Sequence, residues 1–134
     1  MVRINIINPK KLADQHLIAE YNEILKLIGH IKKYPIIKNQ PKNYCLGKGH
    51  INFFKDKIKY LKIRHKIIKK EMKKRGFKAN KTINLNKHQN NWKPKQQDYK
   101  IIKKRLKEKI KLKPNFYRYY KTKKPVKFFN GLLK

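Results

Sequence analysis

Two groups near the start of the chain could together carry out amine chemistry on a sugar. Val2 is small enough that we expect removal of the initiator Met1, which would free the α-amine of residue 2. An α-amine has a pKa of about 8, roughly two units below that of a lysine side chain, so it is the better nucleophile at neutral pH. Attack of an amine on a sugar C1′ gives an imine, which eases elimination at the neighbouring carbons. Glu23, one of only seven acids, could stabilise the cationic sugar and move a proton.

The element that must position Glu23 is a predicted amphipathic helix over residues 12–34. His16, Glu23 and His30 are seven residues apart and Lys26 follows three after Glu23, so we expect all four on one face. An alternative for His16 is a hydrogen bond to Glu20, one turn further on. The opposite, apolar face repeats at helical spacing and comprises Leu17, Ile18, Tyr21, Ile24, Leu25, Ile28 and Ile31.

Two further helices are predicted, over residues 51–74 and 96–112. Gly76 followed by Phe77 is a stop signal for the earlier one. We expect Gly47, Gly49 and His50 to set the turn that enters it. In the helix over 51–74 we expect an inward stripe of Ile51, Phe54, Ile58, Leu61, Ile68 and Met72, with Phe53, Tyr60, Ile63 and Ile67 making the stripe wider. In the helix over 96–112 we expect Tyr99, Ile102, Leu106 and Ile110 to face inward and Arg105 and Lys109 to point outward.

The regions between these helices read as loops, over residues 35–50 and 78–95, and strands have little support. The predicted fold class is therefore all-α: a single compact domain over residues 1–134, with three main helices and long irregular loops.

The charge of the chain indicates a polyanionic partner. There are 39 Lys and Arg residues against seven Asp and Glu, a formal net charge of +32. Neutralising phosphates releases counterions, which gives strong, salt-dependent affinity for nucleic acid. Part of the excess can reflect a general bias of the chain toward Lys, Asn and Ile, but half of this charge would still favour the same partner.

Other classes of site have little support. Cys45 is the one cysteine, which excludes an internal disulfide and a cysteine-based zinc site. The histidines lack metal-ligand spacing and Gly47-Lys48-Gly49 lacks the pattern of a phosphate-binding loop, so we expect no metal and no cofactor. No signal peptide and no membrane-spanning run is evident, so we expect a soluble, intracellular protein that does not bind membranes.

Five motifs together resemble the pyrimidine dimer DNA glycosylase family. They are Met-x-Arg-Ile-Asn from residue 1, Leu-Ala-Asp-Gln-His-Leu-x-Ala-Glu-Tyr-x-Glu from 12, Leu-Gly-x-Gly-His-x-x-Phe-Phe-x-Asp-Lys from 46, Lys-Arg-Gly-Phe from 74, and Pro-x-x-Tyr-x-Tyr-Tyr from 114. Their order and spacing cover most of the chain and leave out only residues 78–97 and the last dozen. The resemblance implies a repair enzyme for ultraviolet-induced cyclobutane pyrimidine dimers, with both glycosylase and abasic-site (AP) lyase activity.

The resemblance also implies roles for particular residues. Val2 stands where the family has its N-terminal amine nucleophile, and Glu23 matches the essential acid. The expected partner is double-stranded DNA that contains pyrimidine dimers or abasic sites, bound by a monomer. The candidate DNA-contacting residues are Arg3, Gln15, His16, Asn22, Lys26, Lys33, Arg105, Lys109, Tyr117, Arg118 and Tyr119.

Several positions depart from the family pattern. Asn22 and Lys26 stand where the family carries Arg, and Phe116 where it has Trp. Loss of bidentate Arg contacts can weaken phosphate positioning or shift the preferred lesion.

Two alternatives to this function stay open. One is a non-catalytic DNA- or RNA-binding protein, and the other is a lyase of the same fold that acts on abasic or oxidised-purine sites. Tyr117, Tyr119 and Tyr120 could equally pack the C-terminal segment onto the helices.

Overall fold

The structure, a computed structural model of the 134-residue chain, describes residues 4–86 and 89–134. Its fold is all-α with one small hairpin, which confirms the predicted class. The elements are a 3-10 helix η1 (Pro9–Lys11), then α1 (Asp14–Lys33), α2 (His50–Phe54), α3 (Ile58–Lys74), α4 (Gln96–Leu112), β1 (Arg118–Tyr119), β2 (Thr122–Lys123) and α5 (Val126–Leu132).

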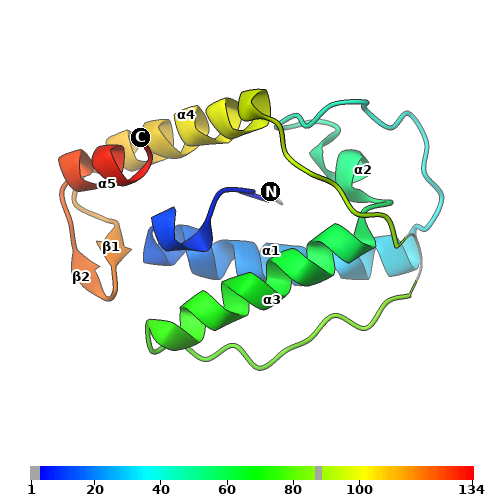
Figure 1. Ribbon diagram of the computed structural model, residues 1–134, viewed down its shortest axis with the longest axis horizontal. Helices are drawn as coiled ribbons and strands as arrows, with labels where there is room; N and C mark the ends of the chain where they lie inside the picture. The colour runs from blue at the N-terminus through cyan, green and yellow to red at the C-terminus, as the bar shows by residue number, and fades with distance from the viewer. Residues whose placement is uncertain (1–3, 87–88) are drawn as a thin grey trace.

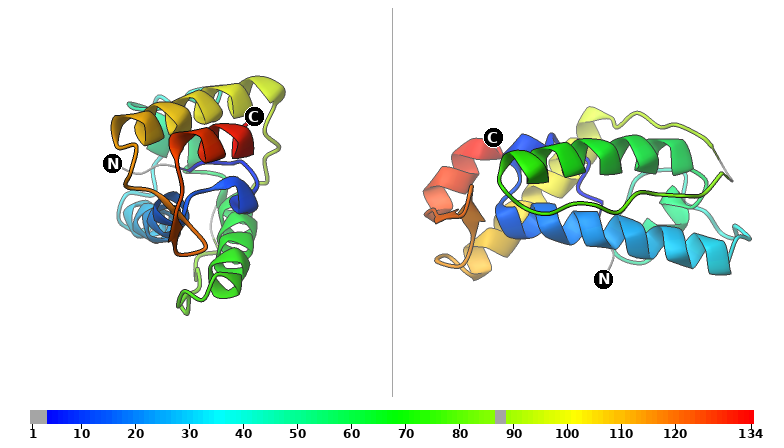
Figure 2. Two further views of the ribbon diagram at one scale, coloured as in Figure 1. Left: turned by 90° about the vertical axis from the view of Figure 1, so that its left-hand side faces the viewer. Right: turned by 90° about the horizontal axis from the view of Figure 1, so that it is seen from below.

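The helices form two layers with the N-terminal segment between them. Helices α1 and α3 lie side by side, and α4 with α5 forms the other layer (Figures 1 and 2). The segment from Ile4 to Ile7 is buried where the layers meet. The segment from Ile4 to Ile7 is therefore a core element of the fold, held among the helices.

The long helices begin and end close to where the sequence predicts. The first stops at Lys33, two residues before Pro35, and α4 spans the predicted residues 96–112. At the end of α3, Gly76 adopts φ 89° and Phe77 N–H returns to the Met72 carbonyl. This is the glycine stop expected there, since only glycine enters the left-handed region without strain.

The prediction of one helix over residues 51–74 is wrong, because the chain breaks between α2 and α3. Asp56 lies at the break and accepts hydrogen bonds from Gln40 Nε2 (2.8 Å) and Lys57 Nζ (3.0 Å). The same Gln40 Nε2 also donates to the Asn52 and Phe53 carbonyls (3.0 and 3.2 Å), so carbonyls that a continuing helix would use accept side-chain hydrogen bonds. The predicted widening of the inward stripe is confirmed for Phe53 and Tyr60, which pack in or against the core, and is wrong for Ile63 and Ile67, which are exposed.

The C-terminal region holds structure that the sequence analysis did not assign. Residues Tyr120 and Lys121 both have positive φ and form the tight turn of the β1–β2 hairpin. Helix α5 follows and packs on α4, with Phe129 fully buried. The adjacent Phe128 and Phe129 supply the apolar surface whose burial stabilises the packing of this short basic helix.

Membrane-spanning helices are not found in the part of the chain that the structure describes: none there is both long and apolar enough to cross a bilayer.

Candidate active site

A cavity of about 430 Å³ lies between α1, α4 and the segment that follows α4. It brings together five of the predicted site residues: Glu23, His16, Arg105, Lys109 and Tyr117. Its remaining lining comes from Asn5, Ala19, Glu20 and Leu106. Two acids, one imidazole and two cations thus converge from two helices that are some eighty residues apart in the chain, and of the two acids Glu20 is already bonded to Arg64.

Helical spacing places the acid in this cavity. His16, Ala19 and Glu23 follow one face of α1 because residues three, four and seven apart lie above one another. His30 continues the series but lies farther along the helix, where its ring contacts Tyr34 (5.1 Å between centroids). The predicted shared face therefore holds for His16 and Glu23, and His30 lies beyond the cavity.

Glu23 has only a loose cationic neighbour on its own helix. The nearest ammonium is that of Lys26, 3.9 Å from Oε1, and the Lys26 side chain is 71% exposed. Such exposed pairs contribute about 0–1 kcal/mol. The Glu23 carboxylate is thus partly shielded from solvent yet remains open to a ligand in the cavity.

His16 is neutral in the folded protein. Burial, with a smaller contribution from the charge of Lys109, lowers its pKa to about 4. Its ring lies against that of Tyr117, with centroids 4.7 Å apart. The alternative of a hydrogen bond from His16 to Glu20 is wrong: no such bond is found among the described residues, and the Glu20 oxygens accept from the Arg64 guanidinium (2.7 and 3.0 Å).

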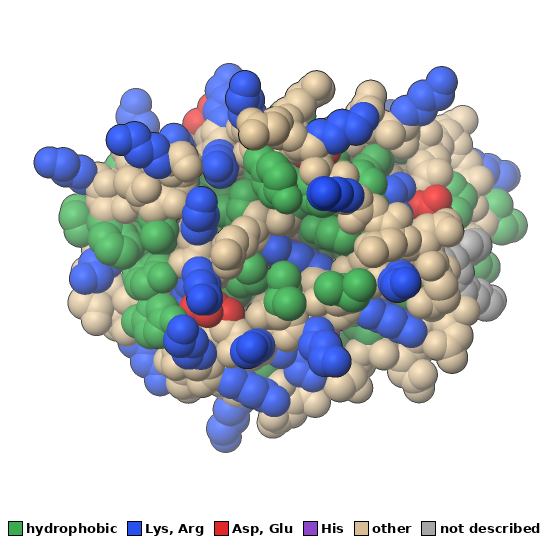
Figure 3. All heavy atoms as spheres, in the orientation of Figure 1, with side chains coloured by type: hydrophobic (Ala, Val, Ile, Leu, Met, Phe, Trp, Pro, Cys, Tyr) green, Lys and Arg blue, Asp and Glu red, His purple; other side chains and the backbone are tan. Residues whose placement is uncertain are grey.

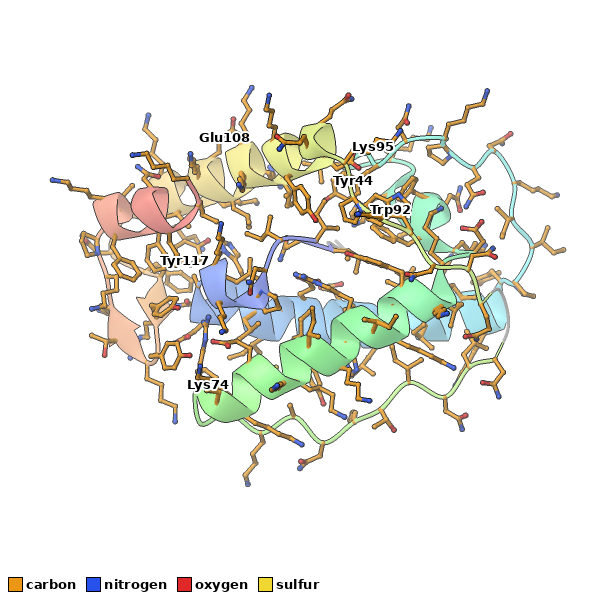
Figure 4. The ribbon with its side chains drawn as sticks, in the orientation of Figure 1. Tyr44, Lys74, Trp92, Lys95, Glu108 and Tyr117 are labelled. Atoms are coloured by element: carbon orange, nitrogen blue, oxygen red, sulfur yellow. The ribbon has the colours of Figure 1, made fainter. Side chains whose placement is uncertain are left out.

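The two cations of α4 both line the cavity, and the predicted outward placement is wrong for Arg105 but holds for Lys109. Arg105 is half-buried, and its Nε is buried without a hydrogen-bond partner among the residues described. Lys109, one turn further on, is exposed at the rim. Figure 4 shows Glu108 on the other side of α4, away from the N-terminal segment. Two cations across from one carboxylate suit an anion that carries a reacting carbon, such as a phosphorylated sugar.

Gln15 holds Tyr117 in place from outside the cavity. Its Nε2 donates to the Phe116 carbonyl (2.8 Å) and its Oε1 accepts from Arg118 N–H (3.0 Å). The residues on both sides of Tyr117 are therefore fixed to the start of α1. Tyr117 itself is buried and lies between the C-terminal elements and α1 (Figure 4).

The hairpin is fastened to the same end of α1 by a buried ionic cluster. Asp14 accepts from the Tyr120 and Lys121 N–H groups (3.1 and 2.7 Å) and from Arg75 Nη1 (2.9 Å). The Arg75 guanidinium lies 4.5 Å from the ring centroid of Tyr119, whose hydroxyl donates to the Lys10 carbonyl. Tyr119 thus packs the hairpin onto the helices, and Arg118 remains exposed.

Other predicted residues lie away from the cavity or outside the described residues. Asn22, Lys26 and Lys33 are exposed and do not line the cavity. Val2 and Arg3 fall outside the described residues.

Asn5 is a cavity residue that the sequence analysis missed. It is 3% exposed, and its Oδ1 has no hydrogen-bond partner among the residues described. A buried acceptor without a donor is costly, so it points to a ligand. The signal was present in the Met-x-Arg-Ile-Asn motif, which ends on this residue.

For a metal site, no group of three or more His, Cys, Asp or Glu side chains is found among residues 4–86 and 89–134. What the cavity offers is acid–base and electrostatic chemistry from its own side chains.

Comparison with known families agrees with this chemistry. The sequence model of the family described as pyrimidine dimer DNA glycosylase matches residues 1–85, which include α1, α2 and α3 and four of the five motifs. Arg105, Lys109 and Tyr117 lie beyond the matched range, yet the fold brings them to the cavity that holds Glu23. The match covers more than half of the chain. The chain therefore belongs to the pyrimidine dimer DNA glycosylase family, a family of enzymes that act on DNA.

Proposed function

We propose that this protein removes the 5′ base of a cyclobutane pyrimidine dimer in duplex DNA and then nicks the strand as an AP lyase. The α-amine of Val2, freed by removal of Met1, is the nucleophile, and Glu23 is the acid–base group. The observation that carries the proposal is the cavity itself. It joins a carboxylate from α1, two cations from α4 and Asn5, three residues after the amine.

The first step forms a bond between the amine nitrogen and C1′ while the bond from C1′ to the base breaks. The base keeps that electron pair and takes the proton that the attacking nitrogen releases, and it stays tethered to the 3′ pyrimidine through the cyclobutane. Opening of the sugar ring then breaks the C1′–O4′ bond, and O4′ gains a proton as C1′ becomes an iminium. Glu23, as an anion beside the sugar, stabilises the positive charge in this step.

The second step cleaves the strand. The iminium acidifies C2′, and Glu23 accepts a C2′ proton. The electron pair left on C2′ expels the 3′ phosphate with the C3′–O electrons. Arg105 and Lys109 bind phosphate oxygens and stabilise the leaving group. Water then hydrolyses the imine and releases the amine for the next turnover.

The surface supports the encounter with DNA. Lys and Arg side chains spread over the face shown in Figure 3, and acids are few. Such a surface attracts the duplex at a rate that falls with ionic strength. At a dimer, lost stacking lowers the cost of kinking the duplex and extruding a nucleotide. The cavity can then receive the damaged sugar.

Borohydride trapping on a duplex with a single thymine dimer tests the proposal. The reductant should fix the imine as a covalent adduct, and peptide mass spectrometry should locate it on the N-terminal residue. A protein that carries an N-terminal extension is the control and should give no adduct. An adduct on a lysine side chain would reassign the nucleophile. No adduct on dimer or abasic duplex would overturn the imine chemistry, and an adduct on abasic duplex alone would leave only the lyase.

A further inference from the structure

The backbone of Ile4 is held from both sides by two buried side chains. Ile4 N–H donates to His50 Nε2 (2.8 Å), and the Tyr44 hydroxyl donates to the Ile4 carbonyl (2.9 Å). All three residues are at most 3% exposed. These partners are 46 and 40 residues away in the chain, so the contacts pin the chain start to a distant part of the fold.

The geometry of His50 fixes its tautomer. Its Nδ1 lies 2.8 Å from the Cys45 carbonyl, and a carbonyl can only accept, so Nδ1 carries the proton. Nε2 is then the acceptor that Ile4 N–H requires. The turn that enters α2 holds the ring in this pose, since Gly47 and Gly49 both have positive φ, which confirms their predicted structural role.

Tyr44 is held as firmly as His50. Its ring stacks on Trp92 (centroids 5.9 Å apart) and meets Phe53 edge-on (6.0 Å). Figure 4 shows Tyr44 and Trp92 next to one another. The aromatic packing leaves the hydroxyl little freedom to turn away from the Ile4 carbonyl.

The backbone just after Ile4 is strained. Ile6 has φ 51°, a left-handed value that is rare for a β-branched residue, and Ile7 N–H closes a three-residue turn onto the Asn5 carbonyl. Arg64 binds the Ile7 carbonyl with one arm of the guanidinium and Glu20 with the rest. Strain of this kind persists only where the surrounding contacts over-determine the backbone, and it concentrates at functional sites.

We infer that Tyr44 and His50 are positioning residues for the reaction: they fix the backbone of Ile4, next to Asn5 in the cavity that holds Glu23. The inference rests on the proposed function, in which the nucleophile is the amine two residues before Ile4. The strained turn at Ile6 then sets where Asn5 lines the cavity. Holding a nucleophile in register spares the entropy of finding its geometry in each turnover.

Two matched pairs of variants isolate the two hydrogen bonds. Tyr44→Phe removes only the hydroxyl bonded to Ile4. Tyr60→Phe is its control, since Tyr60 also packs against Phe54 and Trp92 but shows no hydrogen bond to Ile4 among the described residues. His50→Gln places an amide oxygen near the Nε2 position and keeps an acceptor for Ile4. His50→Asn keeps the donor toward Cys45 but loses that acceptor.

The measurement is the single-turnover rate of borohydride trapping on abasic duplex at saturating DNA, with DNA affinity and melting temperature measured on the same samples. Tyr44→Phe and His50→Asn should trap about tenfold more slowly, with DNA affinity within about twofold. Tyr60→Phe and His50→Gln should trap at near the wild-type rate. The slow variants should melt a few degrees lower, because each leaves a buried Ile4 backbone group unpaired, and amide exchange should speed up more at Ile4 or Asn5 than in the helices.

The outcomes separate this inference from the proposed function. A wild type that traps no adduct would overturn the proposed function and the positioning role with it. A wild type that traps normally, with Tyr44→Phe equally fast, would overturn the positioning role alone. Equal losses in Tyr60→Phe and Tyr44→Phe would show a general packing effect and would also overturn it.

Discussion

Glu20 and Glu23 lie one turn apart on α1 but differ in their ionic partners. Glu20 is 1% exposed and its carboxylate is held by two hydrogen bonds from Arg64. Glu23 faces the cavity, with Lys26 as a distant partner on its own helix. Around Glu20, each buried charge is paired with an opposite charge. Around Glu23, some buried polar atoms have no hydrogen-bond partner among the described residues.

The same contrast holds across the two regions. Asp14, Glu71 and Arg75 form a second closed network below the hairpin, while Arg105 Nε and Asn5 Oδ1 have no hydrogen-bond partner among the described residues. Complete buried networks stabilise the fold. The unpaired Arg105 and Asn5 atoms both lie at the cavity, where a ligand can bond them, whereas a third unpaired atom, His65 Nε2, lies between α1 and α3. Substitutions in the first region should therefore change stability, and those in the second should change activity.

Replacing the cavity acid should give the largest effect. Glu23→Gln keeps the shape but cannot accept the C2′ proton, so we expect dimer cleavage to fall by about a hundredfold or more. The free energy of unfolding should change by less than about 0.5 kcal/mol, because the Glu23–Lys26 pair is weak. Single-turnover cleavage and urea unfolding measure the two quantities. Near-normal cleavage by Glu23→Gln would remove this acid from the reaction.

Replacing the network acid should show the reverse pattern. Glu20→Gln leaves the buried Arg64 charge unpaired, so we expect a loss of about 3 kcal/mol in the free energy of unfolding. Arg64 also binds the Ile7 carbonyl, and the N-terminal segment should therefore loosen. Urea unfolding checks the loss. The comparison would break down if Glu20→Gln were as stable as wild type.

Buried histidines make the stability of the fold depend on pH. His16 has a folded-state pKa of about 4, well below its ordinary value of 6.5, so the unfolded chain binds the proton more tightly. Its contribution is present above pH 6.5 and is lost as the pH falls from there toward 4. Between pH 7 and 5 this one group should cost about 1–2 kcal/mol of stability.

The variants His16→Gln and His65→Gln test this assignment. His65, stacked on Tyr21 between α1 and α3, also has its pKa lowered to about 4 by burial. Each variant should lose less stability than wild type between pH 7 and 5 in urea unfolding. Only His16→Gln should also slow cleavage. Equal acid sensitivity in all three proteins would show that other groups govern the decline.

The sequence predicts which side of each helix is apolar better than it predicts which side chains bond to one another. Spacing alone placed His16 and Glu23 together and located α1 and α4, because periodicity records which side of a helix is apolar. It could not show that Arg64 and Arg75 turn inward, since their partners Glu20 and Asp14 are 44 and 61 residues away. The sequence therefore predicted no role for Arg64 or Arg75.

The same limit explains why Arg105 was predicted to point outward and why Asn5 was not predicted as a cavity residue. Arg105 lies on the polar side of α4, and that side faces the cavity only because α4 packs across from α1 (Figure 1). Asn5 gave no signal beyond its motif, because its burial depends on the turn at Ile6 and the contacts at Ile4. Burial of a polar residue by tertiary contacts leaves no periodic trace.

Asn5 and Asn8 differ in whether their side-chain oxygen has a hydrogen-bond donor, so they test the comparison with the smallest expected effects. Asn8 Oδ1 accepts from Lys10 N–H (3.0 Å) at the start of η1, whereas Asn5 Oδ1 has no such donor among the described residues. Asn8→Leu should cost about 1 kcal/mol of stability, because it removes a cap, and should leave cleavage unchanged. Asn5→Leu should be neutral or stabilising, because an apolar group replaces an unpaired one, yet should slow cleavage about tenfold. Urea unfolding and single-turnover cleavage of both variants decide the point. If Asn5→Leu lost stability and kept full activity, Asn5 would belong with the complete network and the distinction between the regions would fail at this residue.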